Sequence, residues 1–289
     1  MKFAFVVAAS VNYYDGIKAM LNSLKCHGNT ADVVFLKYEH PDNERKFGDL
    51  LTRDYGYTIK RFKHKQGQDQ IQGTAIDRFK LAYEIRNSYD AICLLDADMF
   101  ITANVNLFFE IAAAGFIVTG SNGMIINFNK GYQEYYNLDL GKENIPYTKV
   151  HTTVPIFINK DNMDWFKTWY EFPRKDHFDD FLFLNMVGIK LGKDKKMLCM
   201  PPYIFTGIHH WMLKPETAVM RKGGTLLSGT EEQVYIVHGK WWDQPWIDDL
   251  SVIMFKYLKD QDFGPRNEEK VRCTVNLLCD EFKNYLDYY

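Results

Sequence analysis

The chain has 289 residues, of which 46% are apolar and 16% aromatic, so it can bury a large core and is expected to form one large α/β domain, with or without an appendage. Its 37 acidic and 35 basic residues leave a net charge of -2, which excludes a global positive field that would attract nucleic acid or an anionic membrane. Five cysteines without Cys-x-x-Cys spacing argue against a zinc site and favour a reducing compartment. The sequence shows no signal peptide and no apolar window of roughly 18 residues, so we expect a soluble, cytoplasmic protein.

The first third of the chain alternates between apolar runs and segments with helical spacing. Residues 3–9 form a continuous run rich in Val and Phe, which predicts a parallel strand covered on both faces. Residues 33–38 and 57–62 predict two further strands, with helices expected at 17–24 and 43–55. Strands that alternate with helices in this way are typical of a parallel sheet with crossover helices.

Two loops follow predicted strands. In the first, Tyr13 and Tyr14 either stack on a flat base or simply cover the start of the next helix. In the second, a basic cluster at 60–65 leads into a polar segment with two glycines, which is either a loop that closes over a phosphate-bearing ligand or a solvated strand end. A helix is then expected at 74–87, with Thr74 as its cap.

The most informative segment comes next. Apolar residues at 92–95 end on Asp96 and Asp98, after which the apolar character resumes. At the carboxyl end of a central strand of an open α/β sheet, these acids would lie in the crevice where such folds bind ligands. Carboxylates at i and i+2 of an extended segment point the same way, so one hard cation can take oxygen atoms from both. The alternative is a strand-end turn with two solvated acids, which the apolar residues on both sides disfavour.

The middle of the chain carries further short elements. Helices are expected at 107–114 and 163–170, strands at 116–119, 124–128 and 154–158, and a strand or extended edge segment at 197–205. Residues 129–150 are polar and Tyr-rich with weak periodicity, so we expect an insertion there. Asp179 and Asp180 precede an amphipathic helix at 181–187, which they either cap or connect to a binding site.

A second sharp motif lies toward the C-terminus. Residues 234–237 predict a short strand that ends on His238, and Lys240 follows two residues later. A helix is expected at 246–258. Beyond it, apolar residues at alternating steps of three and four form a stripe along 267–289, which either packs on the domain or pairs with another subunit.

Together these motifs resemble the GT-A nucleotide-sugar glycosyltransferases, and most of all glycosyltransferase family 8, the group of glycogenin and the lipopolysaccharide galactosyltransferases. In that family a strand ending in Asp-x-Asp follows a helix with a basic residue at a fixed distance, and Arg78 stands at that position. The segment 177–185 resembles the family's Asp-Gln-x-x-Leu-Asn element, with Asp180 on its Asp and Phe181 in place of its Gln. Residues 238–241 resemble its His-Gly-Lys-Trp element, although the family separates these residues and here they are consecutive.

The resemblance implies an α/β fold of the GT-A (Rossmann-like) type, with a mostly parallel central sheet flanked by helices and a C-terminal helical tail. The implied catalytic domain covers residues 1–262, with a nucleotide-sugar-binding half at 1–100 and an acceptor-side half at 101–262. The amphipathic helix would occupy 263–289, where it offers a surface for a homo-oligomer.

The implied activity is the metal-dependent, retaining transfer of a sugar from a nucleoside diphosphate donor, expected to be a UDP-sugar. Asp96, Asp98 and His238 are the expected ligands of Mn²⁺ or Mg²⁺, and Asp180, with Asp179 beside it, is the expected catalytic carboxylate. The residues expected to contact the nucleotide sugar are Ala8, Ala9, Tyr13, Arg78, Asp96, Ala97, Asp98 and Lys240.

The acceptor and the class of protein stay open. A saccharide or glycolipid acceptor is the default, while a protein hydroxyl or a modified DNA base is also compatible with the sequence; the net charge of -2 weighs against DNA. A nucleotidyltransferase is the first alternative class, disfavoured because residues 8–14 contain no glycine-rich basic loop. A non-catalytic module that binds a nucleotide sugar or a glycan is the second.

Overall fold

The computed structural model describes most of the chain as far as residue 238. The described residues are 1–8, 14–38, 58–62, 70–97, 99–121, 125–149, 151–171, 180–201, 204–207, 218–221, 225–228 and 233–238.

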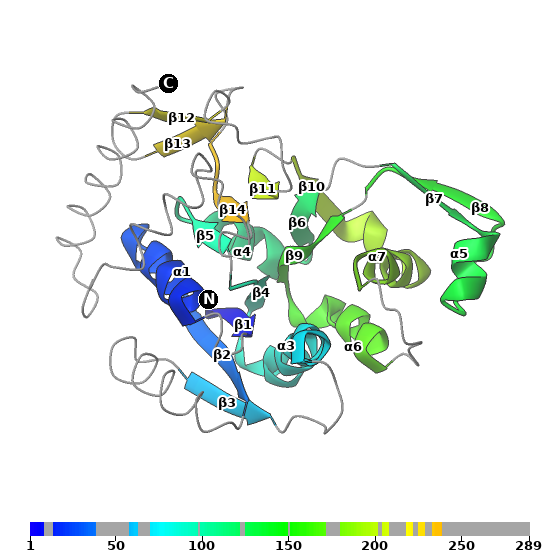
Figure 1. The fold of residues 1–289 in the computed structure, drawn as a ribbon, viewed down its shortest axis with the longest axis horizontal. Helices are drawn as coiled ribbons and strands as arrows, with labels where there is room; N and C mark the ends of the chain where they lie inside the picture. The colour runs from blue at the N-terminus through cyan, green and yellow to red at the C-terminus, as the bar shows by residue number, and fades with distance from the viewer. Residues whose placement is uncertain are drawn as a thin grey trace.

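A seven-stranded sheet forms the centre of this described part (Figure 1). In spatial order the strands are β10 (Met197–Met200), β6 (Ile117–Ser121), β9 (His151–Ile158), β4 (Ala91–Leu95), β1 (Phe3–Ala8), β2 (Asp32–Tyr38) and β3 (Thr58–Phe62). All neighbouring strands pair in parallel except β9, which is antiparallel to both β4 and β6. The predicted mostly parallel α/β sheet is thus confirmed. The strand order reverses beside β1, because β2 lies on one side of it and β4, which follows later in the chain, on the other.

Helices cover both faces of this sheet (Figure 1). The helices are α1 (Tyr14–Cys26), α3 (Gln70–Ile85), α4 (Asn106–Ala113), α6 (Asp164–Glu171) and α7 (Asp180–Lys190). On one face, Phe109 of α4 packs its ring 4.9 Å from Phe3, 5.0 Å from Phe5 and 5.0 Å from Phe157. On the opposite face, α3 packs against α6 and the central strands. A fully buried Phe such as Phe109 is worth about 3–5 kcal/mol on truncation to Ala, so these rings are a main source of stability.

A second, three-stranded sheet adjoins the carboxyl ends of the central strands. It consists of β11 (Phe205–Gly207), β14 (Ile236–His238) and β5 (Met99–Ile101), in that order. β14 is parallel to β11 and antiparallel to β5. Two aromatic contacts of Phe108, 4.7 Å to Phe205 and 4.9 Å to Tyr235, fasten this sheet to α4.

The remaining elements are short. β7 (Ile126–Asn129) and β8 (Asn144–Tyr147) form an antiparallel pair that carries α5 (Lys130–Tyr135), and β12 (Ala218–Arg221) pairs with β13 (Thr225–Ser228). Within the described residues, 3₁₀ helices connect larger elements at η3 (Arg86–Ser88), η4 (Lys160–Asn162) and η5 (Lys193–Lys196). Among the helices of the described residues, none has both the length and the apolar character needed to cross a membrane.

The structure corrects one predicted helix start and shows which elements a predicted insertion contains. α3 begins at Gln70, so Thr74 lies inside the helix and is not its cap. The polar residues before Thr74 suggested a loop, but Gln is a good helix former and is compatible with the first turn of a helix. The predicted insertion at 129–150 contains α5 and β8, which are too short to give a periodic signal.

Some predicted elements lie outside the described residues. These are the helices at 43–55 and 246–258 and the amphipathic helix at 263–289, together with the domain boundary that precedes it.

Candidate active site

The candidate site lies where the strand order reverses, at the carboxyl ends of β4 and β1. The last residue pair of that ladder is Val7 with Leu95, so Ala8 and Asp96 follow at adjacent positions of neighbouring strands. In open α/β sheets this is the place where ligands bind. The backbone turns sharply after Asp96, where the Met99 N–H donates to the Asp96 carbonyl at 3.2 Å, and Ala97 is buried inside that turn.

Arg78 reaches this point from the neighbouring helix α3. Its Nη1 donates to Oδ1 of Asp96, and the two side chains form an ion pair. Arg78 as a whole is 5% exposed. The next residue, Phe79, lies 4.7 Å from Phe166 and 4.4 Å from Trp169 between ring centroids. These aromatic contacts fix α3, and α3 in turn fixes the direction from which Arg78 approaches the carboxylate.

His238 approaches Asp96 from a segment far along the chain. It is the last residue of β14 and pairs with Met99 of β5 and Gly207 of β11. Its Nε2 lies 3.6 Å from Oδ2 of Asp96, the carboxylate oxygen that does not bond to Arg78. The two oxygens of one carboxylate therefore face different partners, and the side chains of Asp96 and His238 both keep some solvent access, at 28% and 23%.

This geometry is compatible with a shared divalent cation. Donor atoms about 2.1 Å from one ion are about 3.0 Å apart at a right angle and about 4.2 Å apart on opposite sides of it. The 3.6 Å between Asp96 Oδ2 and His238 Nε2 falls inside that range. Carboxylate oxygens are ligands that suit Mn²⁺ and Mg²⁺, and an imidazole nitrogen is a common ligand of transition-metal ions. Within the described part of the chain no group of three or more such side chains occurs, and Asp98, the third expected ligand, lies outside it.

The other candidate residues fall at the limits of the described residues. Asp180 is the first residue of α7, and the structure describes its backbone but not its side chain. Ala9, Tyr13, Asp98, Asp179 and Lys240 also lie outside the described residues. The structure thus brings together Ala8, Arg78, Asp96, Ala97 and His238, while the roles assigned to all of these residues stay predictions.

One contributor to the site was not anticipated from the sequence. Ser23, which is buried in α1, accepts a hydrogen bond at its Oγ from the Ile101 N–H at 3.0 Å and donates to the Met20 carbonyl at 2.6 Å. It therefore ties α1 to β5, the strand that follows the acidic turn. A single Ser inside an amphipathic helix gives no sequence signal for such a contact, because its partner lies 78 residues away.

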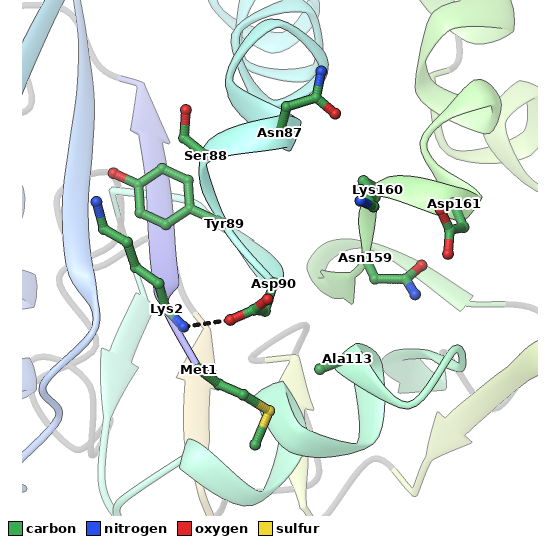
Figure 2. A pocket seen from close by; sticks show the side chains of 10 residues that line it. All are labelled: Met1, Lys2, Asn87, Ser88, Tyr89, Asp90, Ala113, Asn159, Lys160 and Asp161. Atoms are coloured by element: carbon green, nitrogen blue, oxygen red, sulfur yellow. Dashed lines mark hydrogen bonds between the residues drawn. The ribbon is translucent and has the colours of Figure 1, made fainter.

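A pocket of about 320 Å³ occurs elsewhere, at the end of the sheet where the parallel strands begin (Figure 2). Lys2, Asp90 and Asn159 line it, at the amino ends of β1 and β4 and just past the end of β9. The Lys2 N–H donates to Asp90 Oδ2 at 2.6 Å, which ties the two strand starts together. Tyr89, also at the rim, donates to Asp32 at 3.2 Å, and burial together with the Asp32 charge raises the pKa of Tyr89 to about 12. These contacts are structural, and the pocket is separate from the Asp96 site.

Comparisons with known proteins identify the type of fold. No protein-family model matches the sequence, and no curated protein matches it. Solved structures do match. The bifunctional glycosyltransferase WbbM matches with a TM-score of 0.58 and 11% identity over 96% of this chain and 51% of its own, so the chain spans about half the length of that protein.

Two further matches extend the comparison. The glycosyltransferase GlyE of Streptococcus pneumoniae TIGR4 matches with a TM-score of 0.54 and 14% identity over 99% of this chain and 64% of its own. The galactosyltransferase LgtC, solved in complex with donor and acceptor sugar analogues, matches with a TM-score of 0.53 and 14% identity over 89% of this chain and 95% of its own. The fold of this chain is therefore the GT-A fold of these glycosyltransferases.

Proposed function

We propose that the protein is a metal-dependent glycosyltransferase that transfers a sugar from a nucleoside diphosphate donor, a UDP-sugar, to a hydroxyl acceptor. The observation that carries the proposal is the meeting of Arg78, Asp96 and His238 where the strand order reverses, in a fold shared with known glycosyltransferases. Three side chains from α3, the end of β4 and β14 converge on one point, although His238 is far from the other two in sequence.

Asp96, Asp98 and His238 would hold the cation, Mn²⁺ or Mg²⁺. When bound, the ion supplies Lewis-acid neutralisation of the negative charge that develops on the leaving diphosphate, which is worth several kcal/mol. The residues present fit this role, because Asp96 turns one oxygen toward His238 and has its other oxygen fixed by Arg78.

Arg78 has two tasks in this proposal. It holds the Asp96 carboxylate in one orientation by a charge-assisted hydrogen bond, which is stronger than a neutral one. It also leaves a fixed positive charge beside the place where the diphosphate would lie, since a guanidinium stays protonated at any working pH. Lys240 is proposed to add a second positive charge to the diphosphate.

The donor would lie along the ends of β1 and β4. Ala8 and Ala97 are small residues at this edge, and with Ala9 they would let the nucleotide approach the backbone closely, while Tyr13 would stack on the base. Asp180, at the start of α7, is proposed to accept hydrogen bonds from the sugar and to stabilise positive charge at the anomeric carbon, with Asp179 as its alternative. The acceptor is proposed to be a saccharide or glycolipid.

A donor screen with matched variants tests this function. Turnover of each nucleotide sugar, measured by release of the nucleoside diphosphate and by mass spectrometry of the product, should require Mn²⁺ and should stop in excess EDTA. Asp96→Asn should abolish it. Asp90→Asn is the control, because it makes the same substitution at the residue just before β4, at the opposite edge of the sheet. Full turnover in EDTA, or equal activity of both variants, would contradict the proposal.

A further inference from the structure

The approach of His238 to Asp96 depends on a strand of only three residues. β14 pairs with β5 through Ile236 with Ile101, Val237 with Phe100, and His238 with Met99. Successive side chains of a strand point to opposite faces, so a slip of one residue would turn the His238 imidazole away from Asp96. β14 also pairs with β11, again through three residue pairs. Ladders this short specify their register weakly, so a further buried contact strengthens it.

Thr102 provides that contact. It directly follows β5, and its backbone N–H donates to the Tyr235 carbonyl at 2.9 Å, one step beyond the ladder. Its Oγ1 donates to the Val234 carbonyl at 2.8 Å, across 132 residues of sequence. Val234 is fully buried and Thr102 is 4% exposed, so water cannot replace the hydroxyl. A slipped register would leave a buried carbonyl without its donor, at a cost of about 1–3 kcal/mol.

The strand that Thr102 follows, β5, is itself fixed. At one end of β5, the Met99 N–H bonds to the Asp96 carbonyl, which ties the strand to the acidic turn. At the other end, the Ile101 N–H bonds to Ser23 of α1. β5 thus has a fixed position relative to Asp96, and the two hydrogen bonds of Thr102 fix the segment before β14 relative to β5.

We propose that Thr102 is a positioning residue for the metal centre, and that its hydroxyl sets the register of β14 and thereby the distance between His238 and Asp96. The inference deepens the proposed function and rests on it, because it takes Asp96 and His238 as ligands of one cation. Thr102 does not touch the cation or the donor, so its effect must pass through His238.

The test compares substitutions at Thr102 with the same change at another buried threonine. Thr102→Val removes the hydroxyl and keeps the shape, while Thr102→Ser keeps the hydroxyl. Thr119→Val is the control, since Thr119 is fully buried in β6.

Mn²⁺ affinity of the full chain is measured by calorimetry. Hydrogen–deuterium exchange of residues 234–238 is measured in EDTA. Thr102→Val should weaken Mn²⁺ binding about tenfold or more, as the loss of a residue supporting a metal ligand does, and should speed exchange. Thr102→Ser should restore both.

The outcomes separate the inference from the proposed function. If the wild-type chain binds no Mn²⁺, the metal centre is refuted, and the exchange of residues 234–238 alone judges the role of Thr102. If Thr102→Val binds Mn²⁺ as tightly as the wild type or as Thr119→Val does, with unchanged exchange, the inference is overturned. If Thr102→Val does not fold, Thr102→Ala, which cannot overfill the site, is measured in its place against Thr119→Ala.

Discussion

The ion pair between Arg78 and Asp96 predicts a large stability effect in the metal-free protein. Arg78→Met keeps most of the side-chain stem but removes the charge from a side chain that is 7% exposed, beside a carboxylate that is 28% exposed. Breaking a buried pair by removing one partner costs about 3–5 kcal/mol, because the other charge stays buried. Since Asp96 keeps some contact with water, we expect about 2–3 kcal/mol. For a chain of 289 residues, whose unfolding entropy is about 0.6 kcal/mol/K, that lowers Tm by about 3–5 °C.

Thermal unfolding followed by circular dichroism, in EDTA at neutral pH, measures this effect in a double-mutant cycle. Arg78→Met leaves the partly buried Asp96 carboxylate without the guanidinium, and Asp96→Asn removes that charge. The double variant should therefore be more stable than Arg78→Met alone, with a coupling energy of at least about 1 kcal/mol. Addition of Mn²⁺ should reduce the defect of Arg78→Met, because a cation at Asp96 takes over the compensation. Effects that add within about 0.5 kcal/mol would show that the two charges do not interact and would refute the reasoning.

Three further predictions concern the donor, the sugar and acid stability. UDP should raise Tm in Mn²⁺ but not in EDTA, by an amount equivalent to about 2.7 kcal/mol at a hundredfold excess over Kd; an equal shift without metal would mean that basic side chains bind the nucleotide alone. Asp180→Asn should lower kcat by about two orders of magnitude with nearly unchanged Mn²⁺ and UDP affinity, whereas normal kcat with a lower Tm would make Asp180 a helix cap. Burial lowers the pKa of His27 from 6.5 to about 4. The unfolded chain therefore binds more protons between these values, so the stability contributed by neutral His27 is complete above pH 6.5 and is lost as pH falls toward 4, by up to about 3 kcal/mol. His27→Gln should flatten urea-unfolding free energies over that pH range, and an unchanged slope would contradict this origin.

The sequence predicted the parts of the site that rest on local pattern. β4 could be expected because its five residues are all apolar, and the structure shows that all five are buried. An acid that ends such a strand stands out in the sequence. Arg78 and the end of the short strand at His238 were found from a family resemblance, and the structure places both beside Asp96. Both residues were found because their types and their places in the family's motifs can be read from the sequence without the exact bounds of the elements that carry them.

The sequence could not predict the parts that depend on distant partners. β5 has three residues, and its strand character comes from pairing with β14, which lies far along the chain. The hydroxyl of Thr102 looks like that of any other threonine until Val234 is placed against it. The start of α3 was missed for a different reason, because Gly73 and the polar residues around it are common both in loops and on exposed helix faces.

The ladder between β5 and β14 also sets an order of events in folding. Thr102 and Val234 are 132 residues apart, and closing a loop of that length costs about 4 kcal/mol of chain entropy before any contact can offset it. The strands β1, β2 and β4 all lie within the first third of the chain and can pair across shorter loops. We therefore expect that Arg78 and Asp96 can meet in a half-folded protein and that His238 joins them later. Under the proposed function, a nascent or partly unfolded chain holds the carboxylate without the imidazole, so the ability to retain a cation marks the chain that has finished folding.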